Sequence, residues 1–191
     1  MRLILASASP RRRDLLRNAG IDFEVRPAQI VEEIQPDELP EEFARRAARE
    51  KAMQIAASAA DGLFVLGADT VVVIDGQTLG KPSDAQDAAR MLRLLSGRTH
   101  QVHTGICLVR APREIETLKH ETTLVTFRDL DAGEVRHYVE SGEPWDKAGG
   151  YAIQGLASKF VTRISGCYSN VVGLPVAAVY EILKKAVGSG Q

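Results

Sequence analysis

Short apolar runs and amphipathic repeats alternate along the chain and predict its strands and helices. The apolar run at 2–6 predicts a buried strand, and residues 22–26 predict an edge strand. Two long strands are expected over 99–110 and 117–127, joined through the turn at 111–113. Strands or loops are expected over 159–164 and 167–173, and helices over 40–59, 84–95, 132–140 and 174–186.

The turn after the first strand has the features of an anion-binding site. Ser9 suits the N-cap of a helix, Pro10 suits its first turn and Gly20 suits its end. Arginines at 11–13 fill the first turn, where the helix dipole disfavours cations. Because free N–H groups at a helix N-terminus attract anions, we interpret this cluster as a phosphate site. A solvated basic face is the alternative interpretation.

A single acid lies inside an otherwise apolar stretch at 66–74, where Gly67-Ala68-Asp69-Thr70 is followed by Val and Ile residues. A carboxylate in a buried strand must be paired, hydrogen-bonded or bound to a metal. Asp69 is therefore the first candidate for a functional site. The alternative is that Asp69 forms a turn between two strands and that Thr70 caps it.

Two lysines occupy positions that suit an anionic ligand. Lys51 falls on the apolar face of the helix predicted at 40–59, where its side chain either snorkels outward or meets an anion. Lys81 lies in a Gly-Lys-Pro turn, which can aim a charged side chain at a ligand. An ordinary loop lysine is the alternative for Lys81.

Turn residues organise the second half of the chain. Asp75-Gly76 predicts a hairpin, and Ser83 is expected to cap the helix at 84–95. The Gly-rich segment 142–155 permits close approach of its backbone to a ligand. Gln154 in this segment offers both a donor and an acceptor, the pair needed to contact the edge of a base.

Histidine and cysteine spacings argue against a metal site made from these residues. His100 and His103 lie three residues apart in a predicted strand, so they face opposite sides of the sheet. Cys107 and Cys167 lie in apolar surroundings without the spacing of metal ligands, and free thiols suit a reducing cytoplasm.

Composition suits one domain over residues 1–191 with a sizeable core, since 45% of the residues are hydrophobic and 26% are charged. The net charge of −1 offers no positive field for nucleic acid, so local Lys and Arg residues must hold any anion. The apolar run at the N-terminus is too short for a signal sequence or a membrane span. We therefore expect a cytoplasmic protein that binds neither nucleic acid nor membrane.

An ordered set of short motifs resembles the Maf family of nucleoside triphosphate pyrophosphatases over nearly the whole chain. The fold that this resemblance implies is α/β, with a twisted mixed sheet flanked by helices and a cleft between two lobes, similar to inosine triphosphate pyrophosphatases. The motifs are Ala6-Ser7-Ala8-Ser9-Pro10-Arg11-Arg12, Gly67-Ala68-Asp69-Thr70, Gly80-Lys81-Pro82, Ser96-Gly97, Asp146-Lys147-Ala148-Gly149-Gly150-Tyr151 with Gln154, and Val171-Val172-Gly173-Leu174-Pro175.

The reaction that the resemblance implies is hydrolysis of a nucleoside triphosphate between its α and β phosphates. The resemblance implies that Asp69 is the general base or a metal-positioning acid, and that Glu33 is the additional carboxylate near the metal. The metal is expected to be Mg²⁺, with Mn²⁺ or Co²⁺ as alternatives. The residues expected to bind the triphosphate are Ser9, Arg12, Lys51 and Lys81.

Three positions distinguish the branches of the family, and here they hold Arg11, Thr70 and Gln154. This set resembles the branch that acts on dTTP and UTP, whereas the branch acting on 7-methyl-GTP typically has Trp, Gln and Glu. The resemblance thus implies a house-cleaning dTTP/UTP pyrophosphatase and a possible homodimer. The alternative is a nucleotide-binding regulator of cell division and septum formation without significant turnover.

Overall fold

A computed structural model describes residues 2–188, without the side chains of Ile115 and Glu116. The described residues contain a seven-stranded sheet with the order β2-β1-β3-β5-β6-β7, in which β4 also pairs with β3. The strands are β1 (Leu3–Leu5), β2 (Glu24–Val25), β3 (Phe64–Ile74), β4 (Gln77–Leu79), β5 (Thr99–Arg110), β6 (Glu114–Phe127) and β7 (Val161–Ser165). The sheet is mixed, because β1 runs parallel to β2 and β3 while β3 and β4 are antiparallel.

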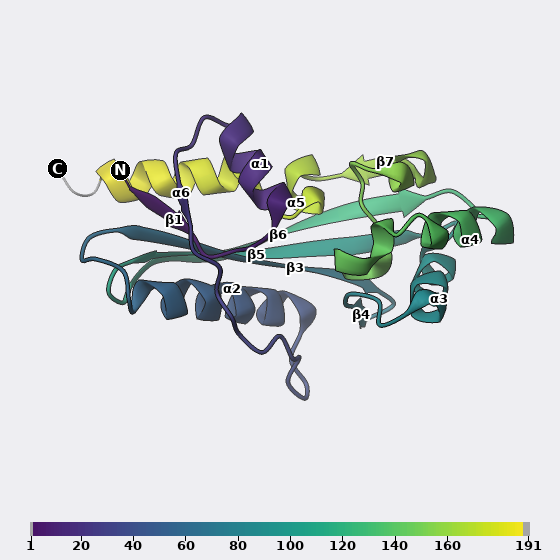
Figure 1. The fold of residues 1–191 in the computed structure, drawn as a ribbon, viewed down its shortest axis with the longest axis horizontal. Coiled ribbons are helices and arrows are strands. Elements are labelled where there is room, and N and C mark those ends of the chain that lie inside the picture. The colour runs from purple at the N-terminus through teal and green to yellow at the C-terminus, as the bar shows by residue number, and fades with distance from the viewer. Residues whose placement is uncertain (1, 189–191) are drawn as a thin grey trace. The chain divides into compact units, whose positions relative to one another are not determined.

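Helices connect these strands, as Figure 1 shows. The α-helices are α1 (Pro10–Asn18), α2 (Pro40–Ala56), α3 (Ala85–Leu95), α4 (Ala132–Glu140), α5 (Tyr168–Val172) and α6 (Val176–Gly188). Three short 3₁₀ helices follow α4, namely η1 (Glu143–Asp146), η2 (Ala148–Gly150) and η3 (Leu156–Phe160). The expected mixed sheet flanked by helices is therefore confirmed.

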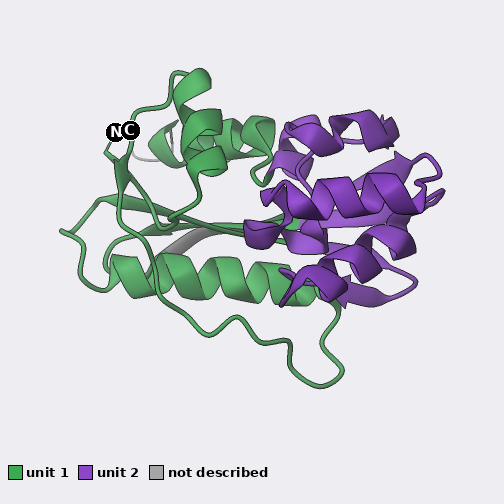
Figure 2. Ribbon diagram, turned by 45° about the vertical axis from the view of Figure 1, so that its right-hand side comes forward, with its two compact units in different colours: residues 1–70, 104–121, 173–191 green, residues 71–103, 122–172 purple. Residues whose placement is uncertain are grey.

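The chain divides into two compact units, which Figure 2 colours separately. The described part of unit 1 comprises residues 2–70, 104–121 and 173–188, and unit 2 comprises residues 71–103 and 122–172. Strands β3, β5 and β6 contribute residues to both units. The single domain and the cleft that the sequence suggests stay predictions.

In unit 1 the strand residues alternate between two apolar cores. Leu5, Leu66 and Leu108 belong to a buried cluster that includes residues of α1 and α6. Ile4 and Val65 belong to a second cluster, with alanines of α2. Figure 1 accordingly shows α1 and α6 on one face of the sheet and α2 on the other. Since successive strand side chains point to opposite faces, odd and even residues of β3 meet different helices.

Two glycines let α2 approach the sheet closely. A Cβ atom at Gly67 would lie 2.1 Å from the carbonyl oxygen of Ala48, and one at Gly105 would lie 2.1 Å from that of Ala44. The facing stripe of α2 consists of small residues at intervals of four, all fully buried: Ala44, Ala48, Ala52 and Ala56. Backbone of α2 thus contacts backbone of β3 and β5 without intervening side chains.

In unit 2 an aromatic cluster supports the Gly-rich segment. The ring of Phe127 lies 4.8 Å from that of Tyr151 and 5.1 Å from that of His100, centroid to centroid. Phe160 and Tyr138 extend the cluster, with their rings 5.3 Å apart. Tyr151 therefore packs the Gly-rich segment against the sheet three residues before Gln154.

Most predicted elements are confirmed, including the helix capped by Ser9 and the hairpin at Asp75-Gly76. Three predictions need correction. Helix α3 is capped by Asp84 rather than Ser83, because the Asp84 carboxylate accepts from the backbone N–H of Asp87. Helix α2 ends at Ala56, short of residue 59, and residues 168–172 form a helix where strands or loops were expected.

Among residues 2–188 the helices are too short or too polar to cross a lipid bilayer.

Replacing Gly67 by Ala should destabilise the protein, because the new methyl group meets backbone of α2 that cannot move aside on its own. We expect the free energy of unfolding to fall by about 2–3 kcal/mol, as in overpacked cores. Denaturant titration of the purified variant measures this change. Gly188→Ala is the control, since a Cβ atom there meets nothing within 4 Å. Equal stability of the two variants would contradict the close contact of α2 with β3.

Candidate functional site

Asp69 lies inside β3, which runs without interruption from Phe64 to Ile74. The alternative of a turn at Asp69 is therefore wrong. Strand β1 pairs with β3 only as far as Leu66, whose partner is Leu5, so β3 continues beyond the carboxyl end of β1. Ligands of α/β proteins commonly bind at the carboxyl ends of parallel strands. Asp69 occupies such a position.

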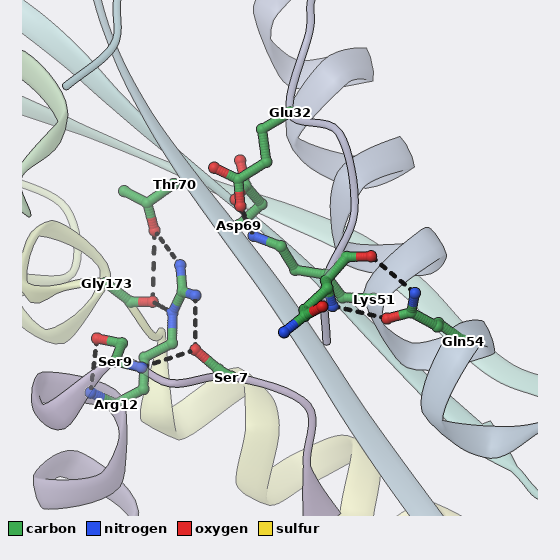
Figure 3. A network of polar contacts seen from close by, with 10 residues as sticks. Ser7, Ser9, Arg12, Glu32, Lys51, Gln54, Asp69, Thr70 and Gly173 are labelled. Atoms are coloured by element: carbon green, nitrogen blue, oxygen red, sulfur yellow. Dashed lines mark hydrogen bonds and ion pairs between the residues drawn. The ribbon is translucent and has the colours of Figure 1, made fainter. Parts of the chain in front are cut away.

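The Asp69 carboxylate meets Lys51 on the face of β3 that α2 covers (Figure 3). The Lys51 Nζ lies 2.5 Å from Asp69 Oδ1 and 2.6 Å from Glu32 Oε1. Lys51 and Asp69 are both 7% exposed, so this pair is largely withdrawn from water. Lys51 was expected either to snorkel outward or to meet an anion, and it meets two carboxylates.

Glu32 reaches Lys51 because its loop is fastened to α2. The Gln29 backbone N–H donates to Gln54 Oε1 at 2.7 Å, and Gln54 Nε2 donates to the Gln29 carbonyl at 2.7 Å. Beyond Glu32, the Arg46 guanidinium donates to the Glu33 carbonyl at 2.8 Å and to both carboxylate oxygens of Glu38. The segment 29–38, which we call the strap, is thus attached on either side of Glu32.

The strap separates the roles of two adjacent acids. Glu32 turns its carboxylate toward Lys51, whereas the exposed Glu33 is held through its backbone carbonyl. Adjacent loop acids follow no periodicity that would show which of them faces the site. The geometry therefore favours Glu32, not Glu33, as the second carboxylate beside Asp69.

The carboxylates of Asp69 and Glu32 have the chemistry that a divalent cation needs. Their oxygens approach one Lys51 ammonium, so a compact cation already lies between two hard oxygen donors. Among residues 2–188 there is no group of three or more His, Cys, Asp or Glu side chains spaced to hold a metal ion. The two acids thus supply part of the coordination of Mg²⁺ or Mn²⁺, and a phosphate would add further oxygen ligands.

Arg12 lies on the opposite face of β3, where α1 begins. Its Nε donates to the Gly173 carbonyl at 2.8 Å, its Nη1 to Ser7 Oγ at 3.2 Å and its Nη2 to Thr70 Oγ1 at 3.1 Å. These acceptors are all neutral, although Arg12 is only 8% exposed. Burial lowers the pKa of Arg12, while the charges of Asp69 and Glu32 act in the opposite direction.

A buried guanidinium with neutral acceptors is a positive charge fixed in place before any anion binds. Ser9 caps α1 beside it, accepting from the Arg12 N–H at 3.5 Å, and Pro10 occupies the first turn. The predicted helix start is confirmed, and its N-terminus carries no acidic side chain in the first turn. Both features suit an incoming phosphate.

Thr70 takes part in holding Arg12. Its hydroxyl accepts from Arg12 Nη2 and lies 2.9 Å from Thr104 Oγ1 and 3.4 Å from the Gly173 carbonyl. Thr104 is fully buried on the neighbouring strand β5. Thr70, expected as a specificity residue, is thus part of the support of the arginine. Arg11 is half-buried on α1 and its specificity role stays a prediction.

Lys81 and Gln154 belong to unit 2, where both are exposed. The Gly80 carbonyl of the Gly-Lys-Pro turn accepts from the Gly149 N–H at 2.9 Å, so this turn and the Gly-rich segment support each other. The roles predicted for Lys81 and Gln154 stay predictions.

The turn that carries Gln154 is held by two side chains. Tyr138 Oη accepts from the Ala152 N–H at 3.2 Å and donates to Glu143 Oε1 at 2.7 Å. Glu143 Oε2 accepts from the Leu156 N–H at 2.9 Å. The backbone on both sides of Gln154 is therefore fixed, which presents its amide from a rigid turn.

His100 and Cys107 are both buried. His100 Nε2 lies 2.8 Å from Tyr151 Oη, and burial lowers the pKa of His100 to about 4, so this ring is neutral at neutral pH. Burial raises the pKa of the Cys107 thiol to about 12, which removes it as a nucleophile.

Comparison with known proteins identifies the family. A protein from Koribacter versatilis named dTTP/UTP pyrophosphatase is 50% identical over 186 residues, which cover 97% of this chain and 95% of the relative. One of the same name from Syntrophomonas wolfei is 50% identical over 181 residues, 95% of each chain. A solved dITP/XTP pyrophosphatase from Mycobacterium abscessus is 19% identical, covers 69% of this chain and 75% of its own, and has a TM-score of 0.41.

The match to the family itself covers almost all of the described chain. Residues 2–186 match the family described as Maf-like protein. This span includes both acids at Lys51, the Arg12 cluster and the turn that carries Gln154. By this match, and by its identity with the two curated relatives, the chain belongs to the Maf family.

Proposed function

We propose that this protein is a nucleoside triphosphate pyrophosphatase that hydrolyses dTTP and UTP to the nucleoside monophosphate and pyrophosphate. Relatives that are about 50% identical over nearly the whole chain carry the name of this activity. The observation that carries the proposal is that β3 carries a buried carboxylate, Asp69, on one face and on the other face holds the buried guanidinium of Arg12 through Thr70. A reacting phosphate needs a base and a fixed positive charge of this kind.

Asp69 is the proposed general base. Water attacks the α-phosphorus while its proton passes to the carboxylate, and the bond from that phosphorus to the bridging oxygen breaks. Pyrophosphate leaves with the electrons of that bond and needs cations to neutralise its charge. In this proposal Arg12, Lys51 and Lys81 supply positive charge, and Ser9 with the start of α1 supplies hydrogen-bond donors.

Asp69 and Glu32 are the residues proposed to hold a divalent cation. This assignment replaces the expected Glu33 by its neighbour, because Glu32 is the acid whose carboxylate lies beside Asp69 at Lys51. The bound cation, Mg²⁺ in the first instance and Mn²⁺ or Co²⁺ as alternatives, would polarise phosphate oxygens and lower the pKa of bound water.

The proposed preference for pyrimidines rests on Gln154 together with Arg11. A carboxamide can pair with the O2, N3–H and O4 groups of uracil or thymine. Thr70 acts differently, since its hydroxyl holds Arg12 and therefore affects every triphosphate. We place the reaction in the cytoplasm, without nucleic acid or membrane as partner, and a homodimer stays a prediction from the family.

Product analysis tests the proposed function. The purified protein with Mg²⁺ or Mn²⁺ is offered dTTP, UTP, dCTP, GTP and 7-methyl-GTP, and pyrophosphate is measured separately from orthophosphate. We expect pyrophosphate chiefly from dTTP and UTP. Preference for 7-methyl-GTP would contradict the specificity argument but leave the reaction standing. Binding without turnover of any nucleotide would favour the regulatory alternative.

Asp69→Asn should reduce hydrolysis of dTTP by at least about a hundredfold, because the amide cannot accept the proton of the attacking water. Binding of dTTP measured without divalent metal should persist or tighten, since a negative charge beside the phosphates is removed. Equilibrium dialysis and pyrophosphate release measure the two effects. Asp61→Asn, an exposed acid of the same unit, serves as control and should retain full activity. Turnover retained by Asp69→Asn would refute the assigned base.

Thr70→Val and Gln154→Glu should separate phosphate positioning from base preference. Loss of the Thr70 hydroxyl removes the hydrogen bond acceptor of Arg12 Nη2, so KM should rise by roughly tenfold and by the same factor for dTTP and GTP.

Gln154→Glu should instead lower kcat/KM for dTTP and UTP relative to GTP, because the carboxylate has no N–H to donate. Steady-state kinetics over the nucleotide panel measures both. A changed ratio of dTTP to GTP in Thr70→Val would contradict the role through Arg12.

A further inference from the structure

Lys51 occupies the place between the two carboxylates that would hold a metal ion. Its Nζ lies 2.5 Å from Asp69 Oδ1 and 2.6 Å from Glu32 Oε1, and its side chain is 8% exposed. At these distances a divalent cation cannot bind both oxygens while the ammonium remains, because like charges would share one small volume. Lysine and metal therefore compete for the same two acids.

Without a nucleotide, the protein also offers few oxygen ligands to a metal ion. Mg²⁺ demands an octahedral set of oxygens and usually takes one or two carboxylates together with substrate phosphates. The described residues bring Asp69 and Glu32 together, and no cluster of three or more potential ligands occurs between residues 2 and 188. A triphosphate would supply the missing oxygens and would also offer anionic partners to the displaced ammonium.

We propose that Lys51 keeps the divalent cation out of the site until a nucleoside triphosphate binds. The Lys51 ammonium neutralises Asp69 and Glu32 in the free protein, and it moves to the phosphates when the metal takes its place. Metal and nucleotide therefore bind cooperatively, and each raises the affinity of the protein for the other. This inference rests on the proposed function, which makes a triphosphate the ligand.

The structure permits this exchange without a change in fold. Lysine carries its charge on a flexible four-carbon stem, so Nζ can move while the backbone of α2 stays against the sheet. Asp69 is fixed on β3. Glu32 is the adaptable partner, because its side chain is 39% exposed and lies between the two attachments of the strap, at Gln54 and at Arg46.

Binding of Mn²⁺ without nucleotide tests the proposal on the full chain. Free Mn²⁺ is measured by electron paramagnetic resonance for the wild type, for Lys51→Met and for Lys184→Met, an exposed lysine of α6. We expect Lys51→Met to bind Mn²⁺ about tenfold tighter than the wild type or more, within the usual range of coupling between sites. Lys184→Met should match the wild type. Adding Asp69→Asn to Lys51→Met should abolish the gain.

A second measurement uses the wild type alone and so remains decisive if Lys51→Met fails to fold. The affinity for Mn²⁺ is determined with and without α,β-imido-dTTP, which blocks the scissile bond, and the affinity for this analogue with and without Mn²⁺. Reciprocity requires that Mn²⁺ and the analogue raise each other's affinity by the same factor, and we expect a factor of about ten or more.

Lys51→Arg is a further control, because it keeps a cation between the acids. This variant should bind Mn²⁺ alone as weakly as the wild type.

Two results would overturn the proposal: a wild type that binds Mn²⁺ equally well with and without the analogue, or a folded Lys51→Met variant that binds it no tighter than the wild type. Both concern binding and are independent of turnover. A protein that releases no pyrophosphate from dTTP yet shows the lysine-dependent gain in Mn²⁺ affinity would refute the proposed function and leave the competition by Lys51 intact.

Discussion

The contact of α2 with the sheet sets the geometry on which the site depends. Because Gly67 and Gly105 lack side chains and α2 presents alanines, helix and strand backbones touch directly. Lys51 lies one turn from Ala48 and shares the buried face of α2, so its stem runs along the sheet rather than out to water. Asp69 comes two residues after Gly67 and faces the same side. A larger residue at Gly67 would move the lysine away from the carboxylate.

Alternation along β3 divides the chemistry between two faces. Asp69 points toward α2 and forms an ion pair, whereas Thr70 points toward α1 and holds Arg12 through a neutral hydroxyl. The strand can therefore place a carboxylate next in sequence to the hydroxyl that holds an arginine, without letting the guanidinium neutralise the carboxylate directly. A salt bridge between them would have consumed both charges. One region of unit 1 thus holds both the Asp69–Lys51 ion pair and a guanidinium whose hydrogen bonds go to neutral acceptors.

The site residues that could be predicted from the sequence are those whose positions violate a local pattern. Asp69 interrupts an apolar strand, Lys51 interrupts an apolar helix face, and the arginines oppose the dipole of α1, so each required a partner that the structure or a ligand must supply. The sequence could not show that Glu32 rather than Glu33 contacts Lys51, because a loop has no periodicity. The attachment of the strap to Arg46 and Gln54 depends on contacts distant in sequence. The Gly173 carbonyl that accepts from Arg12 and the Thr104 hydroxyl that pairs with Thr70 could not be predicted either, since they come from other elements of the fold.

A buried carboxylate pair needs a counter-charge in every state of the protein, and this requirement explains why a lysine suits position 51. Two carboxylates left together without a cation would repel each other. A fixed arginine would satisfy both acids bidentately and resist displacement. The lysine ammonium is a point charge on a flexible stem, which another cation can displace more easily. In our proposal, one side chain therefore neutralises the acids before the nucleotide binds and contacts the phosphates afterwards.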